Sequence, residues 1–144
     1  MEFIIQNALD RGTQQVEFEN VSQANIKVIG VGGAGNNMVG WLYKKGIKGA
    51  EIIATNTDYQ HLNITGADRK FLIGKDCTRG LGCGGFPSKG AEAAQESLTQ
   101  IKEALKTSDM VFVCAGMGGG TGTGAAPVVA QVAKDTGAIV IGTV

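Results

Sequence analysis

Glycine is the feature that most constrains how this chain can fold. It accounts for 23 of the 144 residues, roughly twice its usual share of about 7 per cent. The glycines gather at 30–40, 80–90 and 116–124, and the absence of a Gly-X-Y period excludes a collagen-like fibre. Glycine clusters in an otherwise apolar chain indicate loops that bring the backbone close to another group.

Strand and helix patterns alternate along the chain. Predicted strands are short β-branched runs, and predicted helices carry apolar residues three and four apart. The strands are Ile26–Val31, Glu51–Asn56, Lys70–Ile73, Met110–Ala115 and Ile139–Val144; the helices are Asn36–Lys45, Ser88–Lys106 and Ala125–Lys134. This alternation predicts an α/β fold, a Rossmann-like doubly wound parallel sheet with strand order 3-2-1-4-5.

The ends of the chain differ from its body. Residues 1–25 are polar and weakly patterned, and we expect a flexible N-terminal arm there. Residues 26–144 form the predicted domain. Its last strand has an apolar composition that a bare sheet edge would expose. We therefore interpret 26–144 as a partial domain, truncated before the rest of its fold.

Composition excludes several classes of function. Thirteen basic side chains balance thirteen acidic ones, so a nucleic-acid binder that neutralises phosphates is disfavoured. No apolar run reaches the ~18 residues of a membrane span, and direct membrane insertion is not expected. The three cysteines form no CxxC pair, which disfavours a disulfide framework or a zinc site and favours a cytoplasmic protein.

Two glycine loops follow the first and fourth predicted strands. In the order 3-2-1-4-5 these strands are neighbours, and ligands bind in the crevice at their carboxyl ends. Each loop leads into a helix, whose unpaired N–H groups and partial positive charge suit a phosphate. Glycine is expected at these positions because a Cβ would hold a phosphate away from the amides. The loops therefore predict a phosphate site.

The first loop, Gly30–Asn37, matches the GxGxxG pattern of dinucleotide-binding enzymes. The ribose acid of that class should end the second strand, but Asp58 lies two residues beyond the strand end at Asn56. A nicotinamide enzyme also has no need of the second loop, Gly116–Gly124. No GxxxxGK[ST] is present, which excludes a P-loop. A Rossmann-type oxidoreductase and a non-hydrolysing nucleotide-binding module stay as alternatives.

The stretch Gly118–Gly124, GGGTGTG, resembles the signature loop of the tubulin/FtsZ superfamily of GTP-dependent filament proteins. Three further stretches resemble motifs that separate the FtsZ branch from tubulin: Gly32–Asn37, Asn56–Asp58 and Thr78–Gly85. The four occur in the family's order and at its spacings. The resemblance covers about residues 26–144.

The resemblance implies a GTP or GDP site with Mg²⁺. Gly32–Asn37 and Gly118–Gly124 would hold phosphates, and Thr78–Gly85 would sense the γ-phosphate. Asn37 would reach towards the base. Asp58 and Gln60 would meet the metal through water. The implied nucleotide-binding residues are Gly33, Ala34, Gly35, Asn36, Asn37, Asn56, Asp58, Cys83, Gly84, Gly85, Gly118, Gly119, Gly120, Thr121 and Gly122.

The resemblance also implies a function: GTP hydrolysis by a filament of the division ring, in the cytoplasm at the division site. Subunits would stack head to tail, and the next subunit would supply the catalytic acids from a loop beyond Val144. No catalytic residue is then expected within this chain, which alone should be inactive. Division-ring proteins and membrane tethers would bind through the missing C-terminal part.

Individual residues keep alternative interpretations. Phe86 stands where the family often has Asn. Asp58 can also cap a short helix from Tyr59. His61, the single histidine, is interpreted as a surface or packing residue.

Overall fold

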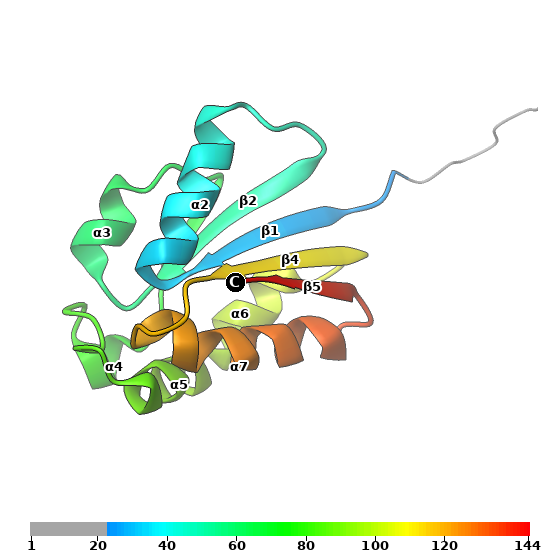
Figure 1. Ribbon diagram of the computed structural model, residues 1–144. Coiled ribbons are helices and arrows are strands. Elements are labelled where there is room, and N and C mark those ends of the chain that lie inside the picture. Colours follow the sequence, from blue (N-terminus) through cyan, green and yellow to red (C-terminus); the bar gives the residue numbers. More distant parts are fainter. Residues whose placement is uncertain (1–22) are drawn as a thin grey trace, which may run out of the picture.

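The computed structural model describes residues 23–144, and its centre is a parallel sheet of five strands (Figure 1). The strand order is β3-β2-β1-β4-β5, as predicted. The strands are β1 (Ile26–Val31), β2 (Ala50–Asn56), β3 (Arg69–Leu72), β4 (Met110–Ala115) and β5 (Ile139–Thr143). Most of the predicted arm, 1–25, lies outside the described residues, so the division into arm and body stays a prediction.

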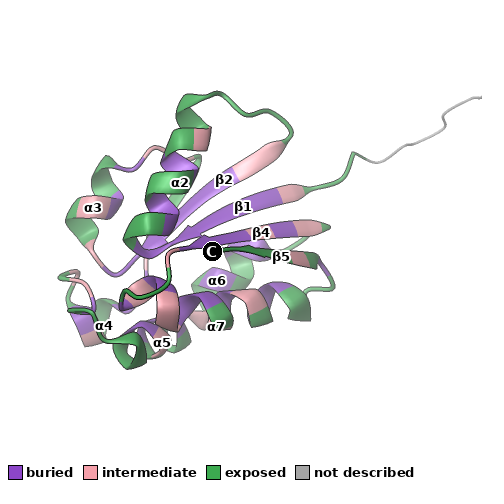
Figure 2. Cartoon of the chain, in the orientation of Figure 1, coloured by how far each residue is buried: buried purple, intermediate pink, exposed green. Residues whose placement is uncertain are grey.

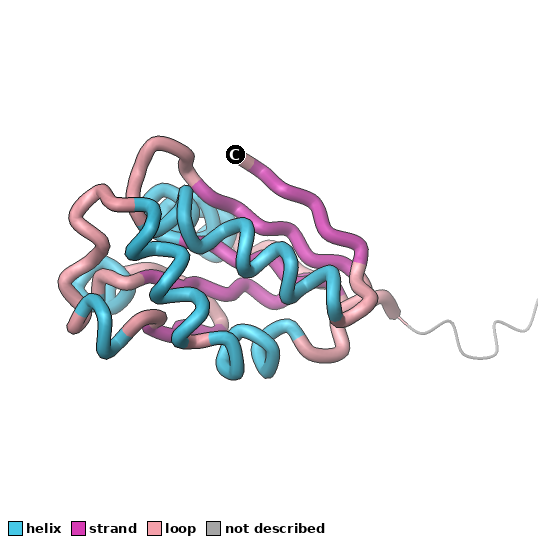
Figure 3. The backbone as a smooth tube through the Cα atoms, turned by 90° about the horizontal axis from the view of Figure 1, so that it is seen from below, coloured by secondary structure: helices cyan, strands magenta, loops and turns pink. Residues whose placement is uncertain are grey.

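Helices cover both faces of the sheet. On one face lie α2 (Gly32–Lys44) and α3 (Tyr59–Ile64). On the other lie α4 (Lys75–Thr78), α5 (Pro87–Glu96), α6 (Leu98–Leu105) and α7 (Thr121–Asp135). Figure 3 views the molecule from this second side, with the helices in front of the strands. The arrangement is the doubly wound fold that strand–helix alternation predicts.

Two apolar clusters, one on each face, hold the layers together. Ile29 and Val113 pack with Ile101 and Val129 beneath the sheet. Val28 packs with Val39 and its neighbours above it. Alternate residues of the central strands thus enter opposite clusters, and Figure 2 shows β1 and β4 buried while β5 is largely exposed. Burial on both faces is why the central strands are rich in apolar residues.

The helix boundaries differ from the prediction. The expected helix Ser88–Lys106 is interrupted at Ser97, whose backbone has φ −103° and ψ 18°. The Ser97 hydroxyl accepts a hydrogen bond from Gly74 N at 3.0 Å. This bond ties the interruption to the loop after β3. Sequence periodicity continues across Ser97, so it gives no signal of the break.

Two helices begin four residues earlier than predicted. The α2 helix starts at Gly32 instead of Asn36, and α7 at Thr121 instead of Ala125. Glycine disfavours helices by about 1 kcal/mol relative to alanine, which is why the sequence favoured loops there. Close packing overrides this preference, because only glycine lets these helical turns approach the neighbouring backbone.

Candidate functional site

Strands β1 and β4 end at the same level of the sheet. Gly30 pairs with Cys114, and Val31 pairs with Ala115. The two glycine segments that follow therefore meet, and a Cβ on Gly32 would lie only 2.8 Å from Gly122 N. The structure thus brings the first and the last of the four predicted stretches into contact.

Two helix N-termini lie side by side at this point. Neither α2 nor α7 has a side-chain hydrogen bond at its N-cap, and neither has an acidic residue in its first turn. The first N–H groups of a helix have no partner within it, and they carry the positive end of its dipole. Two such ends without an acid are suited to an anion.

Some glycines of the site are required by the protein itself. A Cβ on Gly35 would meet the carbonyl oxygen of Cys114, and one on Gly124 would meet that of Pro87. On Gly122 it would lie 2.6 Å from Gly116 O, and on Gly120 it would lie 2.8 Å from Cys83 Cβ. The expectation that a Cβ here would displace a phosphate is therefore wrong for Gly120 and Gly122, where protein atoms occupy that space.

Other glycines of the site face open space. A Cβ on Gly33, Gly118 or Gly119 would meet no atom within 4 Å. The backbone at position 118 also requires glycine, since its φ is +90°. Its N–H donates to Thr123 Oγ1 at 3.0 Å, which fixes the turn before α7. Gly85 of the 78–85 loop is open in the same way, so these four positions of the predicted site leave room for a ligand beside the backbone.

Three side chains join three of the predicted stretches. Thr57 Oγ1 and Thr121 Oγ1 are 2.7 Å apart, and Cys83 Sγ lies 3.4 Å from each of them. Each group can donate once and accept once around this ring. Thr57 and Cys83 are buried. The ring therefore fixes the end of β2, the 78–85 loop and the start of α7 relative to one another.

The 78–85 loop also docks through its backbone. Gly80 O accepts from Tyr59 N at 2.9 Å, and Gly82 N donates to Thr57 O at 3.1 Å. Gly85 reaches α7, since its carbonyl carbon would lie 3.1 Å from a Cβ on Gly120. Phe86, the departure from the family pattern, is exposed. The third predicted stretch thus belongs to the same site as the glycine segments.

The helix before this loop is held by Glu96. Its two carboxylate oxygens accept from Asp76 N and Cys77 N, each at 3.1 Å. The bond from Asp76, with that from Cys77, lowers the pKa of Glu96. Burial and the hydrogen bond with Glu96 raise the pKa of Cys77 to about 11, and burial raises the pKa of Cys114. The raised pKa values disfavour the reactive thiolate form of both cysteines.

Asp58 caps the short helix α3. Its Oδ1 accepts from His61 N at 3.0 Å, which confirms the capping interpretation. Its backbone pairs with Leu81 of the 78–85 loop. Gln60, the other predicted metal residue, is exposed. Within residues 23–144, no group of three or more His, Cys, Asp or Glu side chains gathers to hold a metal.

The asparagines of the site have different surroundings. Asn36 is fully buried, and neither of its side-chain polar atoms has a partner within the described part of the chain. Asn37 and Asn56 both contact His61. Asn36, Asn37 and His61 line a cavity of about 320 Å³ between α2 and α3. Sequence analysis interprets His61 as a surface or packing residue and does not predict these two contacts, because its partners come from distant segments and its neighbours along the chain form no motif.

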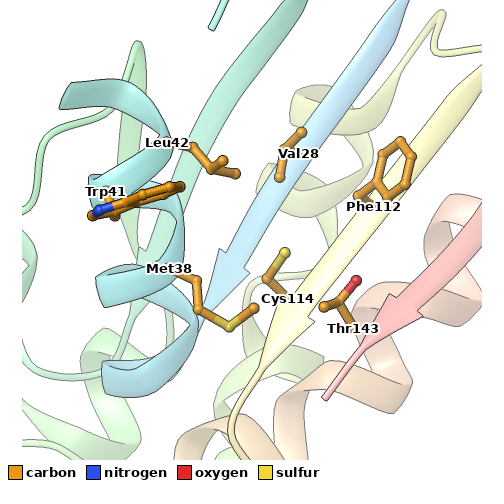
Figure 4. Close-up of a pocket in the computed structure, with 7 residues that line it drawn as sticks. All are labelled: Val28, Met38, Trp41, Leu42, Phe112, Cys114 and Thr143. Carbon is orange, nitrogen blue, oxygen red and sulfur yellow. The ribbon is translucent and has the colours of Figure 1, made fainter. Parts of the chain in front are cut away.

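A second cavity, of about 570 Å³, lies on the α2 face of the sheet (Figure 4). Met38, Trp41 and Leu42 of α2 face Val28 and Phe112 of the sheet. Thr143 supplies the polar oxygen in view, and no charged side chain lines the cavity. Such a lining suits a phosphate less well than the glycine segments do. In the part of the chain described here, no helix has the length and apolar character needed to cross a membrane.

The family model and the curated relatives that match this chain indicate the same family. The model of the Tubulin/FtsZ family, GTPase domain, matches residues 25–144. "Cell division protein FtsZ 2" of Methanocaldococcus jannaschii is 54% identical over 98% of this chain and 37% of its own length. "Cell division protein FtsZ 1" of Archaeoglobus fulgidus is 55% identical over 93% of this chain and 38% of its own length. The chain thus spans less than half of the length of these relatives.

Solved structures agree with this result. An empty FtsZ dimer from M. jannaschii has a TM-score of 0.82 and 49% identity, covering 98% of this chain and 40% of the other. A GTPγS-bound protofilament of CetZ2 from Haloferax volcanii has a TM-score of 0.71 and 30% identity, covering 82% and 39%. Since the family model matches most of the chain, the chain belongs to the tubulin/FtsZ family of GTPase domains.

Proposed function

We propose that this chain binds GTP and GDP as the nucleotide-binding part of a filament-forming cytoskeletal GTPase of cell division. One observation carries the proposal: two uncapped helix N-termini meet at the carboxyl ends of neighbouring strands, with open glycines beside them. The relatives named as cell division proteins and the GTPγS-bound protofilament of CetZ2 support it. A nucleoside polyphosphate matches this site because its charge meets amides and helix dipoles without a lysine.

The proposed contacts follow from the geometry of the glycines. Gly33, Gly118 and Gly119 lie where the backbone is open, and we assign them to the phosphates. Ala34, Gly35, Gly120, Thr121 and Gly122 build the turns that aim those amides. Cys83, Gly84 and Gly85 stand beside α7 and are assigned to the terminal phosphate. Asn36, Asn37 and Asn56 are assigned to the nucleoside side.

The residues at the site fit a magnesium ion bound mainly by phosphates. The hydrogen bond from His61 N engages Oδ1 of Asp58 and not Oδ2, and Gln60 is exposed in the first turn of α3. Mg²⁺ commonly takes one or two protein carboxylates, with water and substrate phosphates as its other ligands. When bound, Mg²⁺ would neutralise part of the phosphate charge. Asp58 and Gln60 would hold its water shell.

Hydrolysis is proposed to need a second subunit. Phosphoryl transfer requires a group that positions the attacking water. Asp58 is the acid placed among the predicted stretches, and it already caps α3. We therefore assign the catalytic acids to the next subunit of a head-to-tail filament, located in the cytoplasm at the division site. Division-ring proteins and membrane tethers would bind outside residues 23–144.

Thermal unfolding with added nucleotide tests the binding proposal. GDP and GTP should each stabilise the protein, by roughly 2.7 kcal/mol at a hundredfold excess over Kd. NADH should give no shift, and GTP turnover by this chain alone should be negligible. A shift with NADH and none with GDP or GTP would contradict the proposal.

A matched pair of variants locates the site. Gly33→Ala places a methyl group at the open end of α2, and Gly142→Ala places one in open space on β5. The first should weaken GDP binding at least about tenfold, since a Cβ separates phosphate from amide. The second should leave binding unchanged. Equal affinities of both variants would show that the phosphates bind elsewhere.

A further inference from the structure

His61 joins two side chains that the proposed function assigns to the nucleotide. Its Nε2 lies 3.1 Å from Asn37 Oδ1, and its Nδ1 lies 3.3 Å from Asn56 Nδ2. The residue itself is held at both ends of its backbone. Its N–H donates to Asp58 Oδ1 at 3.0 Å, and its carbonyl accepts from Thr65 Oγ1 at 2.8 Å. The ring therefore bridges α2 and the end of β2 from a fixed position on α3.

The directions of these hydrogen bonds can be worked out from a backbone amide. Thr57 N is a donor, and it lies 2.9 Å from Asn56 Oδ1, which fixes that oxygen as the acceptor. The Asn56 NH₂ group then points at the ring, so Nδ1 must accept. The ring hydrogen of the neutral imidazole is thus on Nε2, where it donates to Asn37 Oδ1. The chain of bonds has one consistent direction.

We propose that His61 is a positioning residue whose neutral Nε2–H imidazole orients the amide of Asn37 for a nucleoside diphosphate. With its oxygen held by the ring, Asn37 turns its NH₂ group away from His61, as a donor for an acceptor atom of the ligand. Asn56 is held at the same time by the ring and by the backbone of Thr57. This role rests on the proposed function, because it needs the nucleotide to bind beside Asn37.

Imidazole ¹⁵N NMR tests the geometry without any nucleotide. His61 is the single histidine, so its ring signals need no assignment by mutation. At about pH 8, where an ordinary histidine is neutral, the spectrum should show the Nε2–H tautomer. The Nδ1–H tautomer would overturn the proposal, and so would the averaged signals of a freely exchanging imidazole.

GDP titrations by calorimetry test the role. His61→Ala should weaken binding by roughly three- to tenfold, the range for losing one net hydrogen bond. His61→Gln should restore most of the affinity, because its amide also has a donor and an acceptor. Asn63→Ala changes an exposed residue of the same helix and should leave affinity unchanged. Thermal unfolding of each variant checks that the fold is retained.

Rescue by the conservative variant separates orientation from a structural role. If His61→Gln is folded but binds GDP as weakly as His61→Ala, the proposal is overturned. The proposal is also overturned if wild type binds GDP normally and His61→Ala binds it with the same affinity. Failure of every protein, Asn63→Ala included, to bind GDP would instead overturn the proposed function.

Discussion

The glycines of the site divide into two groups that the sequence does not distinguish. Gly35, Gly120, Gly122 and Gly124 are closed in by backbone or Cβ atoms of neighbouring segments. Gly33 and Gly119 have open space where a side chain would be, although they lie within a few residues of the first group. The first group lets helices α2, α5 and α7 approach one another and the sheet. The second leaves amides uncovered.

This difference separates folding from binding within one motif. We call the glycines of the first group closed. A closed glycine is needed for folding itself, because a methyl group at that position would push helical turns apart. At Gly33 and Gly119 the fold places no atom where a side chain would be, so these positions leave room for a ligand. The motif therefore encodes both a packing requirement and a binding surface.

The largest expected effect comes from a closed glycine. Gly35→Ala should destabilise the protein by about 3 kcal/mol or more, because its Cβ meets the carbonyl oxygen of Cys114. Gly40→Ala is the control in the same helix. Its Cβ would make ordinary contacts from 3.6 Å, so it should stabilise by up to about 1 kcal/mol. Urea unfolding followed by circular dichroism measures the stability of both variants. Equal urea midpoints for Gly35→Ala and Gly40→Ala would contradict the division of the glycines into two groups.

The next effect compares two glycines of one segment. Gly119→Ala should keep its stability within about 0.5 kcal/mol of wild type while GDP affinity falls at least about tenfold. Gly122→Ala should lose both stability and GDP affinity, because its Cβ would lie 2.6 Å from Gly116 O. Unfolding curves and GDP titrations give the two quantities. A stable Gly122→Ala with normal affinity would remove the distinction.

A smaller effect is expected from the ring of Thr57, Cys83 and Thr121. Thr57→Val removes a hydroxyl that contacts both partners and should cost about 1 kcal/mol. Thr55→Val, two residues earlier in β2, is the control. Its Oγ1 is buried without a partner among residues 23–144, so its removal should be neutral or stabilising. Destabilisation by Thr55→Val equal to that by Thr57→Val would refute the importance of the ring.

The smallest effect concerns Glu96, which supports the 78–85 loop. Its pKa is lower in the folded protein, so the ionised form stabilises the fold above its ordinary value of 4.5. That stability is lost as pH falls through the folded pKa. Glu96→Gln should therefore melt lower than wild type at pH 7, and the gap should close below about pH 4.5. A gap that is constant with pH would rule out the carboxylate as its source.

Sequence reasoning succeeded where local pattern and structure agree. Ile26–Val31 and Met110–Ala115 match their strands because both are buried on two faces. The strand order followed from the chirality and crevice rules of parallel sheets. The start of α2 at Gly32 was not predictable, since packing against Cys114 reverses a local preference. The hydrogen bonds of the His61 ring were not predictable either, because its partners Asn37 and Asn56 meet it only in the folded chain.

The place of β1 has a consequence for synthesis of the protein. Among residues 23–144 this strand comes first, and it is also the centre of the sheet, where Ile26 pairs with both Ala50 and Met110. One edge of β1 can pair as soon as β2 has left the ribosome, but the other waits for β4. During that interval β1 presents unpaired N–H and C=O groups beside apolar side chains, the kind of edge to which other chains add. The vulnerable state of this fold is therefore the nascent chain that ends before Ala115.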